Sequence, residues 1–302
     1  MNFTHPELAD GRSFGTFAPT AFQALLLRAA SRLHPHRKGG LASVPKFFSS
    51  ASRKFALAGR NDPFDVQSPW GQRVRLYGRD NATDKCLMYG MAPVHDAELA
   101  AMKAVAEASQ APVSFLDIGG NTGLYTLQAW AALQRAGAEI GSWLCVEPNP
   151  QVRPRLSENL ALNGLDAVTI VDCALSDCDG EIEMETDFSN LGQVRIPLDG
   201  AKARKPLYVQ MTTLAKLLTA FGHGTPHIVK VDIEGHEQVM FEAFWKDAPN
   251  VRPHLIVLEM WPGKEDEQIA CMQRGGYRFV SKPGENAIFL HETAPDHPEL
   301  KN

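Results

Sequence analysis

The sequence predicts a mixed α/β fold built on a doubly wound, mostly parallel sheet. Apolar, strand-like runs alternate with helical segments after about residue 110, which is the order typical of a parallel sheet with helices on both faces. The 302 residues are 44% hydrophobic and 22% charged. This composition supplies a buried core and excludes a disordered or fibrous chain. No run approaches the roughly 18 uninterrupted apolar residues of a membrane span.

The chain divides into four segments by charge and pattern. Residues 1–60 form a basic extension with nine basic and two acidic side chains, so the remaining residues carry most of the acidic excess. A hairpin and a helix are expected in 61–110, the sheet domain in 111–293, and a tail in 294–302. The net charge of −5 lacks the positive field of a general nucleic-acid binder.

An amphipathic helix is predicted within the basic extension. One helical face would carry Phe22, Leu25, Leu26, Ala29 and Leu33. Thr20 is placed as its N-cap. Three uses of this helix remain open: docking on the main domain, contact of residues 20–38 with a membrane surface or a partner, and removal as a targeting segment.

The next elements follow from apolar periodicity. Alternation in 64–66 and 74–76 around Trp70-Gly71 predicts a β-hairpin, and a helix over 94–108 follows it. Seven strands are expected at 113–119, 142–147, 168–175, 228–234, 255–260, 277–281 and 287–291. The last two lie close enough in sequence to form a C-terminal antiparallel hairpin.

The cysteines indicate neither a disulfide framework nor a zinc site. They are Cys86, Cys145, Cys173, Cys178 and Cys271. No C-x-x-C pair occurs among them. We expect a cytoplasmic protein, peripheral to a membrane if the basic extension binds one, and we expect no bound metal.

The strongest local signal is the run FLDIGGNTGLY at 115–125. An apolar strand leads into a turn of small residues that lets a ligand approach the backbone, and a helix follows. The G-x-G-x-x-G register of a nicotinamide or flavin site is missing. An acidic residue before the turn suits the methionine part of S-adenosylmethionine. The candidate cofactor contacts here are Asp117, Gly119, Gly120, Asn121 and Gly123.

Two further strand ends carry candidate cofactor contacts. Glu147 ends the strand over 142–147, where a carboxylate can accept both hydroxyls of a ribose, and Pro148 offers a flat apolar surface to an adenine. At the next strand end, Asp172 or the backbone of Cys173 and Ala174 could bind the adenine amino group. For the Asp172 side chain, a purely structural strand end is an equal alternative.

The strand over 228–234 carries three charged residues. Alternation places Lys230, Asp232 and Glu234 on one face. Burying these charges unpaired would be costly, so either they neutralise one another and Asp117, or they open onto a site. Because ligands of open α/β sheets bind outside the carboxyl ends of the strands, Asp232, Glu234 and His236 are expected beside the glycine-rich turn.

Together these segments resemble the FkbM family of class I S-adenosylmethionine-dependent methyltransferases, which have a Rossmann-like fold. The resemblance covers about residues 76–291 and rests on LDIGGNTG at 116–123, VEPNP at 146–150 with ENLALN at 158–163, and KVDIEGHE at 230–237. Gly120 stands where family members usually have alanine. Ala215 stands where many have aspartate, so an acidic contact is not expected there.

The resemblance implies methyl transfer from S-adenosylmethionine to a hydroxyl of a sugar, a polysaccharide or a secondary metabolite. The protein must align the acceptor oxygen and remove its proton. His236 is the leading base because its ordinary pKa, near 6.5, suits this task. Glu234, Asp232 and Glu259, which ends the strand over 255–260, are the alternatives. A divalent metal on Asp232, Glu259 and His236 is not adopted, since the spacing matches no metal motif.

Other functions stay open at this point. They are a nucleic-acid methyltransferase, an N-methyltransferase of small cationic molecules, and a catalytically idle binding module. The partner we expect is a small-molecule or glycan acceptor, and we expect no nucleic acid. A substrate lid is predicted over 181–205, with Phe188, Asn190, Arg195 and Arg204 as its distinctive residues.

Overall fold

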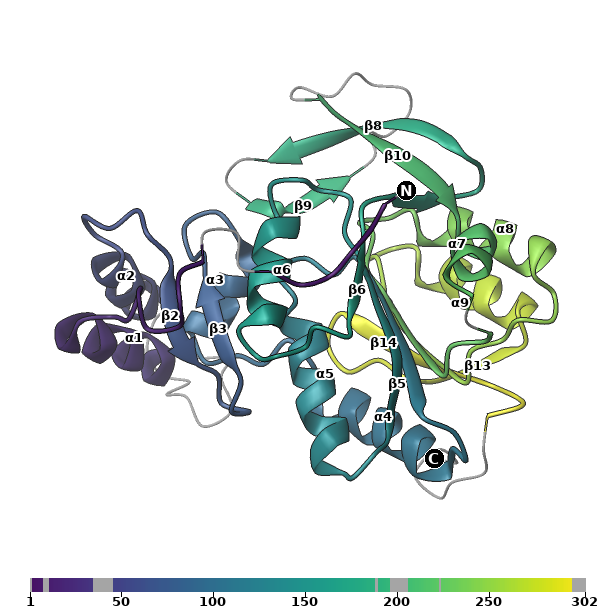
Figure 1. Cartoon of the computed structure of the whole chain (residues 1–302), viewed down its shortest axis with the longest axis horizontal. Coiled ribbons are helices and arrows are strands. Elements are labelled where there is room, and N and C mark those ends of the chain that lie inside the picture. Colours follow the sequence, from purple (N-terminus) through teal and green to yellow (C-terminus); the bar gives the residue numbers. More distant parts are fainter. Residues whose placement is uncertain are drawn as a thin grey trace.

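A mostly parallel sheet forms the centre of the fold (Figure 1). The computed structural model describes residues 2–7, 11–34, 46–187, 190–195, 206–222 and 224–294. Within these residues the strands of the main sheet are β1 (Phe3–Thr4), β4 (Val113–Ile118), β5 (Ile140–Val146), β6 (Thr169–Val171), β11 (Ile228–Val231), β12 (Leu255–Glu259), β13 (Tyr277–Ser281) and β14 (Asn286–His291). Their order is β1-β6-β5-β4-β11-β12-β14-β13.

This order confirms the predicted fold class, with one addition. Strands β6, β5, β4, β11 and β12 are parallel, and β14 and β13 form the expected antiparallel hairpin at one edge. The addition is β1, which pairs antiparallel with β6 at the other edge. The described part of the main sheet therefore has eight strands instead of seven.

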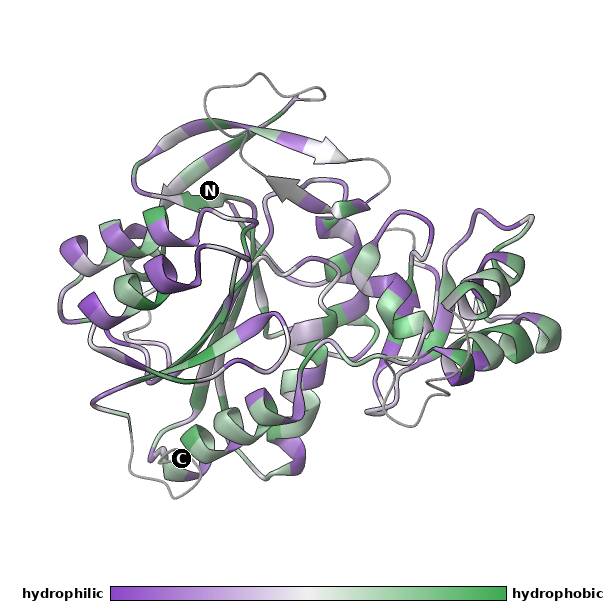
Figure 2. Ribbon diagram, turned by 180° about the vertical axis from the view of Figure 1, so that it is seen from behind, coloured by the Kyte–Doolittle hydropathy of each residue, from purple (hydrophilic) through white to green (hydrophobic). Residues whose placement is uncertain are grey.

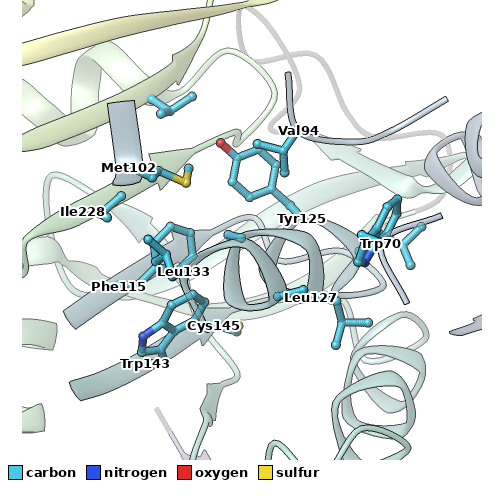
Figure 3. Close-up of a cluster of buried hydrophobic side chains, with 14 of the residues drawn as sticks. Trp70, Val94, Met102, Phe115, Tyr125, Leu127, Leu133, Trp143, Cys145 and Ile228 are labelled. Atoms are coloured by element: carbon cyan, nitrogen blue, oxygen red, sulfur yellow. The ribbon is translucent and has the colours of Figure 1, made fainter. Parts of the chain in front are cut away.

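Helices pack on both faces of the sheet. The side chains of α4 (Asp96–Ala108), α5 (Leu124–Arg135) and α6 (Arg153–Ala161) join one buried cluster, and those of α7 (Leu214–Phe221), α8 (Glu237–Asp247) and α9 (Glu265–Arg274) join another. Successive residues of a strand point to opposite faces. Phe115 accordingly belongs to the first cluster and Leu116 to the second. Figure 3 shows Phe115 beside Trp143, with ring centroids 4.5 Å apart.

The N-terminal elements lie at one end of the molecule (Figure 1). They are α1 (Ala21–Leu33), α2 (Lys46–Ala56), β2 (Phe64–Gln67), β3 (Arg73–Leu76) and α3 (Ala82–Met88). The predicted hairpin is confirmed, since Val66 pairs with Val74. Thr20 caps α1 through a capping box with Gln23, also as predicted. The sequence patterns did not indicate α2 or α3.

A buried arginine joins this hairpin to the main domain. Arg75 on β3 contacts Asp65 on β2 at 2.8 Å and Glu158 on α6 at 3.2 Å. The hydroxyl of Tyr77 donates to the same Glu158 at 2.8 Å. The two carboxylates compensate the buried positive charge of the guanidinium. The hairpin is thereby fixed to the helix that packs beside the glycine-rich turn.

Two strand predictions need correction. The strand expected over 168–175 is two strands in different sheets. The first, β6, ends at Val171, and the second, β7 (Ala174–Ser176), pairs with β10 (Pro206–Thr213). This second sheet also contains β8 (Gly180–Asp187) and β9 (Asn190–Arg195). The strand expected over 228–234 ends at Val231. Glu234, three residues after this end, has a φ of 58°. This left-handed conformation lies outside the β region.

Among the described helices, none has both the length and the apolar character needed to cross a membrane.

Candidate functional site

A cavity of about 230 Å³ opens at the carboxyl ends of β4, β5, β11 and β12. One wall carries cofactor candidates, and the structure brings together Gly119, Asn121, Glu147, Pro148, Cys173 and Ala174. The other wall carries all four proton-transfer candidates: Asp232, Glu234, His236 and Glu259. The parallel strands thus place residues from distant segments in one pocket, as expected for an open α/β sheet.

The glycine-rich turn forms the floor of this pocket. The N–H groups of Gly119 and Gly120 both donate to the carbonyl oxygen of Val146 at 3.0 Å, which holds the turn against β5. Gly119 has a φ of 83° and Asn121 a φ of 48°. Both residues line the pocket, and the left-handed conformation of Gly119 is one that glycine adopts at little cost.

Glu147 is held between two backbone donors. Its Oε2 accepts from the N–H of Asn121 and its Oε1 accepts from the N–H of Asn149, both at 2.8 Å. Burial raises the pKa of Glu147 to about 7. Each carboxylate oxygen has two lone pairs, so each can still accept one hydroxyl from the pocket side.

Beneath the turn lies a buried ion pair. Lys230 places its Nζ 3.1 Å from the carbonyl oxygen of Gly119, 3.2 Å from Oδ2 of Asp232 and 3.6 Å from Oδ1 of Asp117. Although burial lowers the pKa of Lys230, the attraction of Asp232 and Asp117 outweighs it and the pKa is raised. The charges of this strand therefore partly neutralise one another, which was one of the two predicted outcomes.

Several predicted cofactor contacts lie off the pocket wall. Asp117 is fully buried under the turn, where its Oδ2 accepts from the hydroxyl of Thr126 at 2.5 Å. Gly120 and Gly123 are also absent from the lining. A Cβ on Gly123 would stand 2.8 Å from a methyl group of Leu156, so this glycine lets α6 pack closely. These residues support the turn from behind.

Asp172 also lies outside the pocket lining. Its carboxylate accepts hydrogen bonds from the backbone N–H of Asn2 at 2.5 Å and from the Asn2 side chain at 2.7 Å. The side chain therefore ties the N-terminal strand to the main sheet, which is the structural alternative considered above. Cys173 and Ala174, which follow it, do line the pocket.

The opposite wall is acidic. Burial, followed by repulsion from Asp232, raises the pKa of Glu234 to about 7. Burial, followed by repulsion from Asp232, Glu234 and Glu237, raises the pKa of Glu259 well above its usual range. The buried Oε2 of Glu259 has no hydrogen-bond partner among the described residues. At neutral pH, Glu234 and Glu259 therefore keep protons to a greater extent than exposed carboxyl groups would.

His236 begins α8 at the edge of the same wall. Its Nε2 lies 2.9 Å from the hydroxyl of Ser176 on β7. Burial lowers the pKa of His236, which keeps the ring neutral at pH 7. A neutral imidazole can accept a proton.

Residues that the sequence patterns did not indicate complete the pocket. Ala82 and Thr83 of α3 line it together with Gly192 and Gln193 of β9. The N–H of Ala82 donates to Asn190 Oδ1 at 2.9 Å, so α3 and β9 are joined across the pocket rim. The lid predicted over 181–205 was the sequence indication available for β9. No local pattern marks α3.

The predicted lid is described only in part. Asn190 lines the pocket, and Arg195 ends β9. Phe188 lies outside the described residues, as does the whole of 196–205, which includes Arg204. Within the part of the chain that is described, no three His, Cys, Asp or Glu side chains are grouped so as to hold a metal ion.

The chain is similar to several solved methyltransferase structures. An FkbM methyltransferase from Methylobacillus flagellatus KT shares 13% identity, over 60% of this chain and 44% of that one, with a TM-score of 0.42. A SAM-dependent methyltransferase from Agrobacterium tumefaciens shares 13%, over 76% and 69%, with a TM-score of 0.39. Precorrin-6y C5,15-methyltransferase from Geobacter metallireducens GS-15 shares 12%, over 66% and 88%, with a TM-score of 0.38.

The chain spans less than half the length of the Methylobacillus protein. No curated protein matches it. The family model of the methyltransferase FkbM domain matches residues 117–279, which is more than half of the chain and includes both walls of the pocket. The chain therefore belongs to the FkbM family of methyltransferases.

Proposed function

We propose that this chain transfers a methyl group from S-adenosylmethionine to a hydroxyl of a sugar, a polysaccharide or a secondary metabolite. The observation that carries the proposal is the composition of one pocket. Glu147 and Pro148 on one wall offer the contacts that an adenosine needs, and His236 and Glu234 on the other wall are able to accept a proton at neutral pH.

The residues present fit the proposed cofactor. Glu147 would hold the ribose hydroxyls with the lone pairs that its two backbone donors leave free. Pro148 would cover one face of the adenine, and the backbone of Cys173 and Ala174 would meet its edge. The acidic wall suits a ligand that carries an ammonium and a sulfonium group. When bound, S-adenosylmethionine supplies an electrophilic methyl group.

The task of the protein is then to orient the acceptor hydroxyl and take its proton. His236 is placed for this role, because it is neutral, lines the pocket and is oriented by Ser176 at 2.9 Å. Glu234 is the second candidate base, since a carboxyl group with a pKa of about 7 is half ionised at neutral pH. One of these groups would take the proton that the acceptor oxygen loses when it is methylated.

A small-molecule amine is the second candidate acceptor. The observation that favours it is the acidic wall of Asp232, Glu234 and Glu259. One buried oxygen of Glu259 has no hydrogen-bond partner in the part of the chain that the structure describes. A cationic substrate would stabilise the ionised form of these carboxyl groups. This alternative changes the acceptor atom from oxygen to nitrogen and leaves the cofactor wall unchanged.

The test is transfer of a labelled methyl group from S-adenosylmethionine to a panel of sugars, phenolic metabolites, amines and RNA. Mass spectrometry of each product then locates the methyl group. The proposal expects a methyl ether on a sugar or metabolite. A methyl group on an amine or a nucleobase would contradict oxygen transfer, and the amine result would support the second candidate.

A further inference from the structure

The helix α2 exposes its large apolar side chains to solvent and buries small side chains on its opposite side. Phe47 is 73% exposed and Phe55 69% exposed, and Phe48 lies on the same side at 53%. Ser49 and Ala56, on the opposite side, are fully buried. A helix on the surface of a globular protein normally buries its apolar stripe and exposes its polar side. In α2 the side with Ser49 and Ala56 faces the protein, and the phenylalanines face outward.

The neighbouring helix α1 repeats this arrangement. Phe22 is 67% exposed and Leu25 60% exposed, whereas the small Ala30 is buried. Docking of this face on the main domain was one of the three uses left open above, and the exposure of Phe22 and Leu25 speaks against it. The physical reason is that α1 packs against α2 through the side around Ala30.

The two helices form a defined antiparallel pair, which we call the helical hairpin (residues 21–33 and 46–56). The Ser49 hydroxyl donates to the carbonyl oxygen of Ala30 at 2.9 Å, and the Gln23 amide donates to that of Ala56 at 3.2 Å. Figure 2 shows both helices side by side at one end of the molecule, with apolar residues along them. Their outward phenylalanines are thus held in place from the inner side.

A further anchor fixes the helical hairpin to the rest of the chain. Arg53 donates through Nε to the hydroxyl of Tyr89 at 2.8 Å and through Nη1 to the carbonyl oxygen of Gly78 at 3.0 Å. A polar contact of this kind sets the rotation of α2 about its axis. The exposure of Phe47 and Phe55 therefore follows from specific packing, and the apolar face has no cover within the described residues.

The charge of the segment indicates what would cover that face. Residues 11–61 contain nine basic side chains and no acidic one. Arg28, Arg32 and Lys54 are exposed on the helical hairpin itself. A second copy docking face to face would bring these like charges together, which is unfavourable. An anionic surface would be attracted to them.

We propose that the helical hairpin binds the surface of an anionic lipid bilayer. Its phenylalanines enter the boundary between headgroups and acyl chains, and Arg28, Arg32 and Lys54 contact the lipid phosphates. Basic residues combined with exposed Phe and Leu are the pattern of helices that lie in a membrane interface. Nucleic acid would also attract the basic side chains, but it offers no apolar environment to the exposed aliphatic side chain of Leu25. A lipid surface accounts for both the basic and the apolar side chains.

The test is vesicle flotation of the full chain. Vesicles of phosphatidylcholine with about 30% phosphatidylglycerol are compared with vesicles of phosphatidylcholine alone. The proposal expects retention on the anionic vesicles and weak retention on the neutral ones. The double variant Phe47→Ser/Phe55→Ser should lower the partition coefficient about tenfold or more, and Arg28→Glu/Lys54→Glu should lower it on anionic vesicles only.

A matched control keeps this test specific. Tyr208 is also an exposed aromatic residue, at 57%, but lies on β10, so Tyr208→Ser should leave vesicle binding unchanged. Thermal unfolding shows whether each variant is folded. Because the substituted side chains are exposed, we expect the midpoint of thermal unfolding to stay unchanged. Absence of binding to anionic vesicles would overturn the proposal. Retention on duplex DNA that depends on the cations but not on the phenylalanines would also overturn it, as would a dimer that Phe47→Ser dissociates.

Discussion

The backbone of Gly119 lies directly against the carbonyl oxygen of Asp232. A Cβ at Gly119 would stand 1.8 Å from that oxygen, and the φ of 83° is itself unfavourable for any other residue. We therefore expect Gly119→Ala to displace the glycine-rich turn from β11 and to lower the free energy of unfolding by about 3 kcal/mol or more. Urea unfolding measures this loss.

Gly137 provides the control for this substitution. Its φ of 75° is similar, but nothing lies within 4 Å of an added Cβ. Gly137→Ala should cost only the conformational term, about 1 kcal/mol. Equal losses at the two positions would show that the contact with Asp232 carries no weight.

Arg75 should be worth far more to stability than an exposed arginine. Arg75→Ala leaves the buried carboxylates of Asp65 and Glu158 without their cation, which costs about 3–5 kcal/mol. Arg274 forms a pair of similar length with Glu242, but both side chains are about half exposed. Arg274→Ala should change the free energy of unfolding by less than about 1 kcal/mol. Chemical unfolding of both variants checks the contrast.

The acidic wall should make the protein less stable as pH rises. Glu259 has a raised pKa in the folded state, so its contribution is complete below the unfolded pKa, near 4.5, and is lost as pH increases through the folded value. Glu259→Gln imitates the protonated form. We expect it to raise the thermal midpoint by about 2–4 °C at pH 8 and to change it little near pH 5.

Glu267 is the comparison residue for this pH effect. It is an exposed carboxylate on α9, and Glu267→Gln should give the same small shift at both pH values. If Glu259→Gln were neutral or destabilising at pH 8, the repulsion that we assign to Asp232 and Glu234 would be absent.

Removal of the proposed base should act on turnover. With the acceptor identified, His236→Gln should lower kcat about 10²- to 10⁴-fold while the affinity for S-adenosylhomocysteine stays within about threefold, since other residues are proposed to hold the cofactor. Ser176→Ala should lower kcat less and shift its pH profile, because Ser176 only positions the ring. A large loss in Glu234→Gln together with an active His236→Gln would move the base to Glu234.

The sequence predicted those parts of the fold that local patterns encode. The apolar runs of β4, β5, β11 and β12 marked the sheet, and the ends of these strands marked most of the pocket. The run over 168–175 reads as one strand because six of its eight residues are apolar. Its division into β6 and β7 depends on pairing with β1 and β10, whose residues are far away in sequence.

The remaining site residues could not be found locally for the same reason. Thr83 lines the pocket because α3 is tied to the turn from outside, where Asn81 donates to the side chain of Asn121 at 2.7 Å. Asp117 was expected on the wall because of its place before the turn. It lies beneath the turn, beside Lys230 of the neighbouring strand β11, whose Nζ is 3.6 Å from its Oδ1.

The central claim is that this pocket binds S-adenosylmethionine through Glu147. Calorimetric titration of the folded chain with S-adenosylmethionine and S-adenosylhomocysteine tests it most directly, with Glu147→Gln measured in parallel. We predict binding in the micromolar range that strengthens as pH rises through about 7, where Glu147 ionises, and that weakens about tenfold or more in the variant. Absence of binding to the folded wild-type chain, or equal affinity of the variant at every pH, would contradict the claim.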